Sequence, residues 1–489
     1  MRRPDENGIA IIVTMFMVLI LSLLGSSLMF VSRTETFSSL NYQTMSQVRY
    51  AAESGVHSAA NHILWTYASP GTAADPIANY DTSMTPVLYN NAPVVLSSNP
   101  SVASNYPVAA VRDAFSAATQ GTLNVNGVRV GYTVVARLIS MRQIPDAAAG
   151  GSLATLQTWE LTGTGSVAGV GSASLEVSAI LEHNDTPLFT YSTFATDSGC
   201  EALSFGGDSH TDSYSSATYG GSGVPSTDAF AGDVGTNGSL EGFGTTQING
   251  TLSSPRTGVG SCSDGNVTAL DGNLSQVTGG LISLAQVVDY PTPPMPSPLP
   301  PETSDSFTKA GGCPAGASYC TASLDGATIT PPTASTKVVL GNVSVGSQTQ
   351  LHLAAGIYVV NSLNFGAQAT IIVDGPGPVI FQVAGQNEDM PIDLTGGALV
   401  NASFDANDLQ IFYGGTGTVR MVGGPGGAYT VYAPQASVDL VGTADFYGAI
   451  VGKTVSDLGN AAVHYDRNLL NGGVTVGNPM LQSFNWKNY

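Results

Sequence analysis

Two short acidic segments contain residue types that bind divalent cations. In GDSHTD, Asp208, His210 and Asp212 alternate, so on a β-strand their side chains would share one face. This spacing gives at most three ligands and matches no complete metal motif. Carboxylates in Gly-rich turns usually accept hydrogen bonds from their own backbone, and we favour that interpretation.

The second acidic segment, QNEDMPID, places Glu388, Asp389 and Asp393 close together. Carboxylate oxygens are the ligands that calcium prefers, so these three residues are a candidate calcium site. They also lack full ligand spacing, and we favour a solvated turn for this segment as well. The sequence therefore predicts no cofactor, and calcium binding is the alternative.

Four cysteines, Cys200, Cys262, Cys313 and Cys320, complete the set of residues with metal-binding or redox chemistry. An even number in an exported chain indicates two disulfides, with three connectivities open, and Cys313 with Cys320 is the natural local pair. A zinc site would need tight spacings such as C-x-x-C, which do not occur here. We expect structural disulfides.

Catalytic chemistry finds little support in the sequence. A polysaccharide lyase needs a basic residue and a cation beside the uronate, and a glycosidase needs two carboxylates around one bond. The sequence has no P-loop and no nucleophile elbow, and His464 lies in a strand pattern. We predict that the protein is not an enzyme. The cations after residue 200 form no close pair: Arg256, Lys309, Lys337, Arg420, Lys453, Arg467 and Lys487.

The composition favours turn-rich β structure in more than one domain. The chain has 489 residues, 58 of them Gly, and only 10% are charged. The formal net charge is −20, with 15 Lys and Arg. Such a chain repels phosphate backbones, so nucleic acid is excluded as an expected partner. An acidic surface suits a soluble exported protein.

The N-terminus predicts a membrane-spanning helix. Residues from Ile9 to Val31 are uncharged, and as a helix they would extend about 34 Å, enough for a hydrocarbon core of about 30 Å. Arg2 and Arg3 favour a cytoplasmic N-terminus, which leaves the rest of the chain outside. A cleaved signal peptide is the alternative, but its apolar region would be shorter.

The helix is expected to continue beyond the membrane. Val48, Ala52, Val56 and Ala59 recur at three- and four-residue spacing and mark one apolar face up to about Tyr67. The Ser-Pro-Gly segment that follows would end the helix, because Pro cannot continue it. We therefore predict one long helix over residues 9–68.

The same segment resembles a known family. The leader ending in Gly8, the apolar run IAIIV, the stretch SRTETFSSLN and the motif YAAESG resemble the N-terminal module of PilX-like minor pilins of type IV pili. The resemblance implies cleavage after Gly8, methylation at Ile9, and partners among other pilin subunits and the pilus assembly machinery. Val13 stands where major pilins carry Glu, which argues against a major subunit. An ordinary signal-anchor helix is the alternative.

Residues 69–190 are expected to form a pilin-like α+β region by analogy with that family. They contain a short helix near 111–118 and strands at 123–139, 158–165 and 174–183. Asn126-Gly127 predicts a hairpin turn, because both turn positions favour positive φ. These strands would pack against the helix.

The sequence of the rest of the chain predicts a Gly-rich β-solenoid, similar to a right-handed β-helix. Short apolar strands separated by Gly, Asn and Ser turns fall into a first block, residues 191–289, and a second block, residues 304–475. A β-sandwich or jelly roll fits the same alternation. Residues 290–303, with seven prolines, would form an extended strap or linker, and residues 476–489 a C-terminal tail.

The terminal block also resembles Gly-rich solenoids fused to PilX-like N-termini in large bacterial surface proteins. Together the two resemblances imply a minor pilin, held in the inner membrane before assembly with its bulk outside, and then exposed on the pilus or cell surface. There it would serve assembly, adhesion or contact with a glycan or host ligand. The alternative function is a membrane-tethered β-helix that binds or cleaves extracellular carbohydrate.

Overall fold

The computed structural model describes residues 7–67, 70, 75–125, 128–146, 152–167, 173–309, 312–314, 316–333, 336–422, 427–443, 445–471 and 475–488. The chain divides into two compact units. The helix-sheet unit contains residues 1–142, 155–184 and 478–489, and the stacked-strand unit contains residues 143–154 and 185–477. Most of the leader expected at residues 1–8 lies outside the described residues.

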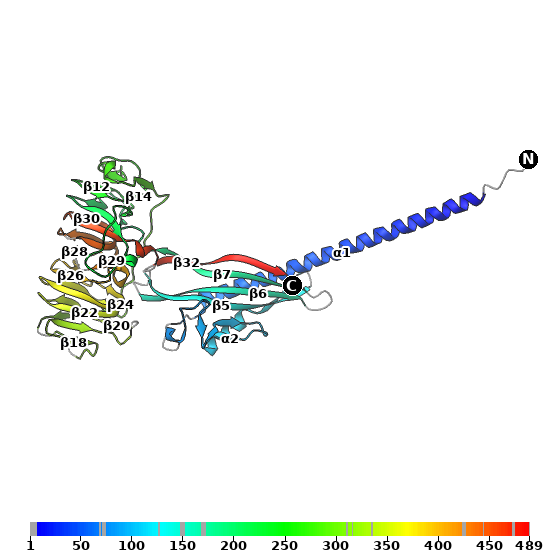
Figure 1. Cartoon of the computed structure of the whole chain (residues 1–489), viewed down its shortest axis with the longest axis horizontal. Coiled ribbons are helices and arrows are strands. Elements are labelled where there is room, and N and C mark those ends of the chain that lie inside the picture. The colour runs from blue at the N-terminus through cyan, green and yellow to red at the C-terminus, as the bar shows by residue number, and fades with distance from the viewer. Residues whose placement is uncertain are drawn as a thin grey trace, which may run out of the picture. The chain divides into compact units, whose positions relative to one another are not determined.

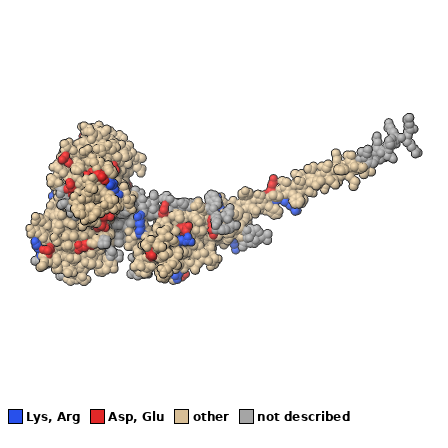
Figure 2. Space-filling model, in the orientation of Figure 1, with Lys and Arg blue, Asp and Glu red and all other residues tan. Residues whose placement is uncertain are grey.

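The helix-sheet unit begins with the predicted long helix, α1 (Asn7–Trp65) (Figure 1). Residues 10–32 of this helix carry no charged side chain and are exposed, as Figure 2 shows. From Val48 onward, one face is fully buried in the core of this unit. Among the described residues, α1 is the one helix long and apolar enough to cross a membrane. The predicted division into an apolar half and an amphipathic half is therefore present.

A mixed sheet packs against the second half of α1. Its strand order is β3-β5-β32-β7-β6, with β4 paired to β5. The predicted hairpin pairs Val125 with Val128 in antiparallel register, and its Asn126-Gly127 turn lies outside the described residues. The bounds are β3 (Val95–Ser97), β4 (Gly121–Val125), β5 (Val128–Asp146), β6 (Ser152–Val167), β7 (Ala173–Pro187) and β32 (Thr475–Asn488), with α2 (Ala109–Ala118), η1 (Ile77–Asn79) and a small hairpin of β1 (Leu88–Tyr89) and β2 (Ala92–Pro93) beside them.

Strand β32 differs from the expectation of a separate C-terminal tail at residues 476–489. It lies between β5 and β7 in the strand order, so the end of the chain returns to the sheet that precedes the Gly-rich blocks. A sequence-local analysis misses this because the paired strands are separated by the whole stacked-strand unit. The stacked-strand unit is therefore an insertion between two strands of one sheet.

Two glycines of β6 let this sheet approach α1 closely. A Cβ atom added at Gly165 would clash with the carbonyl oxygen of Val48, and one added at Gly163 would clash with that of Ala52. Larger side chains at these positions would hold the strand away from the helix. The TGTG segment therefore sets the helix-sheet distance.

The stacked-strand unit consists of short strands joined into one 24-stranded sheet. All its strand pairs are parallel except the antiparallel pair β18–β19. A jelly roll or β-sandwich is built from antiparallel pairs, so the register differs from that alternative.

The strands of the first block are β8 (Thr193–Ala195), β9 (Leu203–Phe205), β10 (His210–Tyr214), β11 (Val234–Thr236), β12 (Leu240–Gly242), β13 (Gln247–Ile248), β14 (Leu252–Ser254), β15 (Leu270–Asp271) and β16 (Leu281–Ser283), with η3 (Ser216–Thr218) and η4 (Leu274–Gln276). Those of the second block are β17 (Ser304–Phe307), β18 (Cys320–Ala322), β19 (Gly326–Ile329), β20 (Lys337–Val339), β21 (Asn342–Val345), β22 (Gln350–Val360), β23 (Ser362–Phe365), β24 (Ala369–Val383), β25 (Ile392–Asp393), β26 (Gly397–Val400), β27 (Leu409–Tyr413), β28 (Val419–Val422), β29 (Ala428–Val441), β30 (Phe446–Asp457) and β31 (Ala462–Asp466), with η5 (Ala406–Asp408) and η6 (Arg467–Leu470).

One inward row of side chains shows how the strands stack. Its members are buried, and each pairs in register with the next: Val343, Leu363, Ile392, Val419, Val438, Val455, Leu203, Leu240 and Leu270. The row passes directly from Val455 in β30 to Leu203 in β9. The two blocks therefore share one core, and the end of the second block contacts the beginning of the first.

This order means that the chain enters the stack in its middle. Strand β8 pairs with β30 on one side and with β11 on the other. The first block proceeds from there to β16, and the second block returns from β17 toward β30. The last strands, β30 and β31, therefore lie between the two blocks and join them.

The proline-rich segment runs along the second block. Tyr432 donates a hydrogen bond to the carbonyl oxygen of Pro291, Lys337 to that of Ser297 at 2.7 Å, and Gln386 to that of Pro300 at 3.0 Å. These donors belong to different coils of the stack. The sequence left open a linker or a strap, and these contacts describe a strap that carries the chain from the β16 end toward β17.

Candidate functional site

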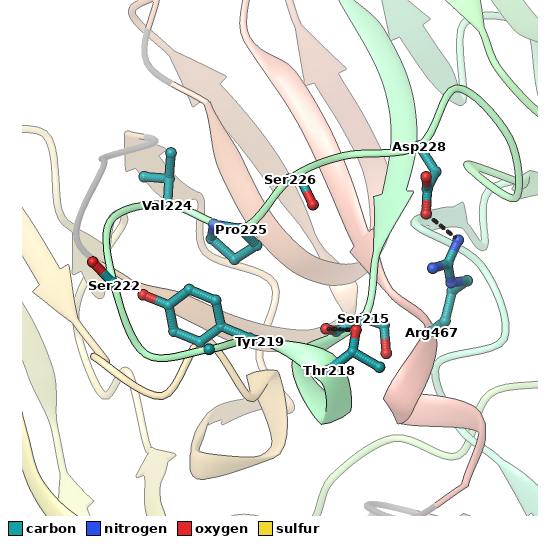
Figure 3. Close-up of a pocket in the computed structure, with 10 residues that line it drawn as sticks. Ser215, Thr218, Tyr219, Ser222, Val224, Pro225, Ser226, Asp228 and Arg467 are labelled. Carbon is teal, nitrogen blue, oxygen red and sulfur yellow. Dashed lines mark hydrogen bonds and ion pairs between the residues drawn. The ribbon is translucent and has the colours of Figure 1, made fainter.

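A cavity of about 350 Å³ opens in the stacked-strand unit beside the junction of the two blocks. The loop after β10 forms most of its wall, and Arg467, the first residue of η6, forms the remainder (Figure 3). Residues more than two hundred positions apart therefore meet at this site. The lining residues are Ser215, Thr218, Tyr219, Gly220, Ser222, Val224, Pro225, Ser226, Asp228 and Arg467.

Backbone pairing brings the two walls together. Strand β10 is parallel to β31 in a five-residue register from His210 with Ala462 to Tyr214 with Asp466. The loop then turns back, because Ser213 and Asp228 exchange backbone hydrogen bonds of 3.1 and 2.7 Å. The strand ladder therefore fixes both ends of the loop.

A buried carboxylate fixes the start of each wall. Asp466, which has no exposed surface, accepts hydrogen bonds from the backbone N–H of Ser216 at 3.1 Å and of Asn468 at 3.0 Å. Its burial raises the pKa of the carboxyl group, while these hydrogen bonds lower it. Asp466 thereby ties the loop after β10 to the helical turn that carries Arg467.

The charged pair of the cavity is Arg467 with Asp228. Nη1 of Arg467 lies 2.8 Å from Oδ2 of Asp228 and donates a hydrogen bond of 3.1 Å to the Ser213 hydroxyl. The guanidinium also lies 4.7 Å from the ring centroid of Phe230, within cation–π range. Both charged groups are partly exposed, at 29% and 47% of their side-chain surface. They are held in place and remain accessible from the cavity.

The remaining lining is a mixture of hydroxyl groups and apolar surface. Tyr219 donates its hydroxyl to the carbonyl oxygen of Gly223 at 2.6 Å and packs edge-on against Phe404. Pro225 is buried, and Val224 is about half exposed. In Figure 3 the Ser226 hydroxyl points to the space between Pro225 and the charged pair. The site offers one acid, one base and several neutral hydroxyls.

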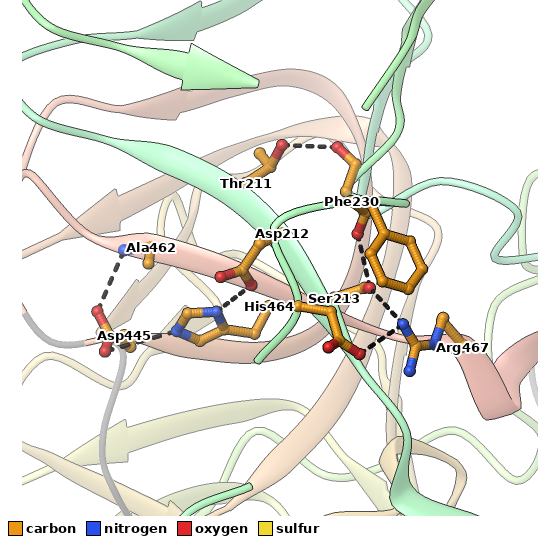
Figure 4. A network of polar contacts seen from close by, with 10 residues as sticks. Thr211, Asp212, Ser213, Phe230, Asp445, Ala462, His464 and Arg467 are labelled. Carbon is orange, nitrogen blue, oxygen red and sulfur yellow. Dashed lines mark hydrogen bonds and ion pairs between the residues drawn. The ribbon is translucent and has the colours of Figure 1, made fainter. Parts of the chain in front are cut away.

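Beside this cavity lies a second polar group centred on His464 (Figure 4). His464 is 4% exposed, and its Nδ1 makes a short hydrogen bond to Asp212, its register partner on β10. Its Nε2 lies 3.5 Å from Oδ2 of Asp445, and its ring packs on Tyr447 with a centroid distance of 4.5 Å. The histidine therefore connects β31 with β10 at the junction of the two blocks.

The His464 group lacks the nucleophile of a hydrolase. In the portion of the chain that the structure describes, both ring nitrogens of His464 face carboxylates, and no hydroxyl or thiol contacts them. A Ser-His-Asp arrangement needs a hydroxyl on one side of the ring. The hydrogen bond between His464 and Asp212 therefore cross-links two strands, and its two residues are 252 positions apart in the sequence.

The three residues of the first candidate metal segment make separate contacts in the structure. Asp212 pairs with His464, while Asp208 accepts a hydrogen bond from the Thr245 hydroxyl at 2.9 Å. The ring of His210 lies 6.1 Å from that of His464. Among the described residues, no group of three or more His, Cys, Asp or Glu side chains has the arrangement of a metal site.

The second candidate metal segment is also spread over separate contacts. Glu388 accepts a hydrogen bond from the Asn342 amide at 3.1 Å. Asp393 accepts from the backbone N–H and the hydroxyl of Thr395, and the Asp389 carbonyl oxygen accepts from the Thr418 N–H. Asp393 thus forms the turn-type contact that Gly-rich loops favour.

The cysteines form two disulfides. Cys313 pairs with Cys320, and Cys200 pairs with Cys262, with 7 and 62 residues of separation. The shorter one lies beside β18, near the β17 end of the second block, and the longer one joins the β8–β9 connection to the loop before β15. Each lies in one block and restrains its loops.

The residues expected at the processing site lie at the start of α1. Gly8 and Ile9 belong to its first turn, and the exposed large apolar side chains follow from Ile11 to Val31. The pocket residues, in contrast, had no sequence signal. Arg467 and Asp228 lie far apart in the sequence, and only the β10–β31 register brings them together.

Comparison with known proteins identifies two segments. Residues 7–57 match the family described as PilX N-terminal, and residues 339–471 match a domain of unknown function, DUF7305. The N-terminal module is therefore PilX-like. A solved structure, the competence-associated pilin ComZ from Thermus thermophilus, has 14% identity and a TM-score of 0.26, with 91% of this chain and 97% of that chain covered. That TM-score is too low to equate the two folds. No curated protein matches the chain.

Proposed function

We propose that this protein is a minor pilin-like component of a type IV pilus or a related secretion filament. In this proposal α1 joins other pilin subunits, and the stacked-strand unit, a β-solenoid in our interpretation, is displayed for assembly, adhesion or surface contact. The observation that carries the proposal is the coincidence of two properties in one segment. The part of α1 that matches the PilX N-terminal family, residues 7–57, includes the exposed apolar side chains from Ile11 to Val31.

The physical argument starts from the cost of that surface in water. From Ile11 to Val31, most large apolar side chains are more than half exposed, including Phe16 at 64% and Phe30 at 73%. A lipid bilayer or the apolar helices of neighbouring subunits would cover such a surface. The segment carries no charge before Arg33, so either environment is suitable. In this proposal the same apolar surface of α1 contacts lipid before assembly and the helices of neighbouring subunits in the filament.

We place the N-terminus in the cytoplasm and the rest of the chain outside the inner membrane before assembly. Arg2 and Arg3 favour this orientation. The two disulfides suit an oxidising compartment. Pilus assembly machinery would then move the processed subunit into the filament.

The proposed role is structural and interactive. Among the residues that the structure describes, no hydroxyl group contacts the His464 ring nitrogens, and the charged pair at the cavity suits binding. The alternative, a membrane-tethered carbohydrate-cleaving protein, would need a carboxylate pair around one bond. Carbohydrate binding without cleavage is compatible with the cavity and is taken up below.

Mass spectrometry of the mature N-terminus, with fractionation of sheared filaments, tests the proposal. We expect a chain that begins at methylated Ile9 and is present in the filament fraction. Replacing Gly8 with Val should leave an uncut chain in the membrane, because it blocks the expected cleavage. An intact Met1 on the natural chain, together with its absence from filaments, would refute the pilin role.

A further inference from the structure

We infer that the cavity formed by the loop after β10 and Arg467 binds a neutral sugar through two adjacent hydroxyl groups. The inference rests on the proposed function, because it requires the stacked-strand unit to be displayed outside the cell. It assigns the surface contact to one place, the cavity of about 350 Å³ in Figure 3, and to one ligand class. That volume is at the lower end of the range for small-ligand sites, about 300 to 1,000 Å³.

The Arg467–Asp228 pair matches the hydrogen-bonding pattern of a vicinal diol. The guanidinium offers only donors and the carboxylate only acceptors, and their contact atoms lie 2.8 Å apart. Two neighbouring sugar hydroxyls are separated by about the length of a hydrogen bond. One hydroxyl can therefore accept from Arg467 while its neighbour donates to Asp228. Hydrogen bonds to charged groups are also stronger than neutral ones.

The charge of the site favours a neutral ligand over an anion. The lining contains one cation, Arg467, and its charge is balanced by Asp228 within the same pair. A phosphate, sulfate or carboxylate would be repelled by Asp228 and would find no second cation in the lining. A polyol meets no such repulsion.

The other walls suit the remaining surface of a sugar ring. Ser222 and Ser226 bear hydroxyls, which can donate or accept as the ligand requires. Val224, Pro225 and Tyr219 add apolar surface on the side away from the charged pair, where the C–H face of a pyranose can pack.

The charged pair is organised before any ligand arrives. Ser213 and the Phe230 ring hold the Arg467 guanidinium, and the Ser213–Asp228 backbone bridge holds the carboxylate. The entropic cost of ordering these side chains when a ligand binds is therefore small. The open, polar site still predicts weak binding by one subunit, which many copies along a filament would strengthen through avidity.

Binding to neutral glycans tests the inference. The full chain would be purified in a detergent without sugar groups and presented to immobilised neutral and acidic glycans, followed by titration calorimetry with the neutral hits. We expect binding to neutral sugars that is insensitive to salt. Arg467→Met and Asp228→Ala should each weaken binding at least tenfold, because each removes one half of the diol contact.

Two further variants keep the test decisive. Ser226→Leu changes an exposed loop residue and fills the cavity, so it should abolish binding even if the charge variants fold poorly. Lys453→Met alters the separate cavity beside the start of the strap and should bind like the natural chain. Circular dichroism establishes that each variant is folded.

Three results would overturn the inference: absence of binding to any neutral glycan at millimolar concentration, binding confined to acidic glycans, or full binding by the Ser226→Leu variant. Filament incorporation would be measured on the same strains. A chain that binds sugar but never enters filaments contradicts the proposed function alone. A chain that enters filaments but binds no sugar contradicts only this inference.

Discussion

At the scale of single residues, Asp457 is a buried carboxylate at the end of β30. It has no exposed surface, and burial raises its pKa to about 6, although hydrogen bonds from Gly459, Ser209 and Ala461 and the nearby His210 oppose the shift. The folded state therefore holds this proton more tightly than the unfolded chain, whose Asp has a pKa of about 3.9. As pH rises from 4 through 6, the stability of the stacked-strand unit should fall.

Replacing Asp457 with Asn should remove this pH dependence. We expect Asp457→Asn to exceed the natural chain in stability by up to about 3 kcal/mol at pH 8 and by little at pH 4. Denaturant unfolding followed by tyrosine signals measures it, because the three tryptophans, Trp65, Trp159 and Trp486, belong to the helix-sheet unit. The exposed Asp264→Asn is the matched control. A constant difference across this pH range would contradict the explanation.

Gly165 offers a second residue-scale test, in the helix-sheet unit. A methyl group there would meet the Val48 carbonyl oxygen of α1, so the helix must move away from β6. Gly165→Ala should therefore cost about 1 to 3 kcal/mol, the range for overpacked cores. Gly131→Ala, whose nearest neighbour would lie at 3.9 Å, is the control. Tryptophan fluorescence during denaturant unfolding compares the two variants, and equal stability would refute the close-packing argument.

Sequence patterns gave part of the residue-scale description. The local pair Cys313–Cys320 was the natural choice, because its spacing permits a short bridge. Asp212 was singled out with Asp208 and His210, its neighbours on one strand face, yet its partner is His464. A pairing across 252 residues depends on strand register, which no local pattern contains.

At the scale of elements, the two disulfides should differ in their contribution. In the chain-entropy model, closing a loop of 62 residues is worth about 4 kcal/mol and closing one of 7 residues about 2 kcal/mol. Converting Cys200 and Cys262 to Ser should therefore lower the free energy of unfolding more than the same change at Cys313 and Cys320. Unfolding of both double variants, with and without reductant, gives the comparison. The reverse order would show that native-state contacts outweigh loop closure.

Element types were predictable where the pattern was local. The apolar and amphipathic halves of α1, the hairpin of β4 with β5, and the short helix α2 all follow from periodicity or turn residues. The order of the strands was not predictable, because inward Val and Leu residues fit many neighbours equally well.

At the scale of the whole molecule, the stacked-strand unit is an insertion. The sheet of the helix-sheet unit takes β7 before the insertion and β32 after it, and these two strands are neighbours in the sheet. The sequence predicted consecutive domains, because its patterns follow one another along the chain. Only the return of β32 shows that one unit interrupts the other.

An excised chain tests this organisation. Joining Pro187 to Thr475 through a short Gly-Ser linker removes residues 188–474, which hold all strands of the stacked sheet, but keeps both neighbouring strands. We expect the remaining helix-sheet unit to fold, with Trp159 buried as in the full chain. Tryptophan emission and cooperative unfolding would establish this. A matched chain that also lacks residues 475–489 should be less stable, and equal stability would assign β32 no role in the sheet.

The position of β30 between the blocks has a consequence for biosynthesis. A chain cut short between the strap and β30 would lack the centre of the stack, and the apolar faces of both blocks would stay uncovered. Maturation of this unit must therefore wait for the last strands to emerge. Nonsense mutations near the 3′ end of the gene should consequently be as damaging as early ones, and their products should be removed by proteases.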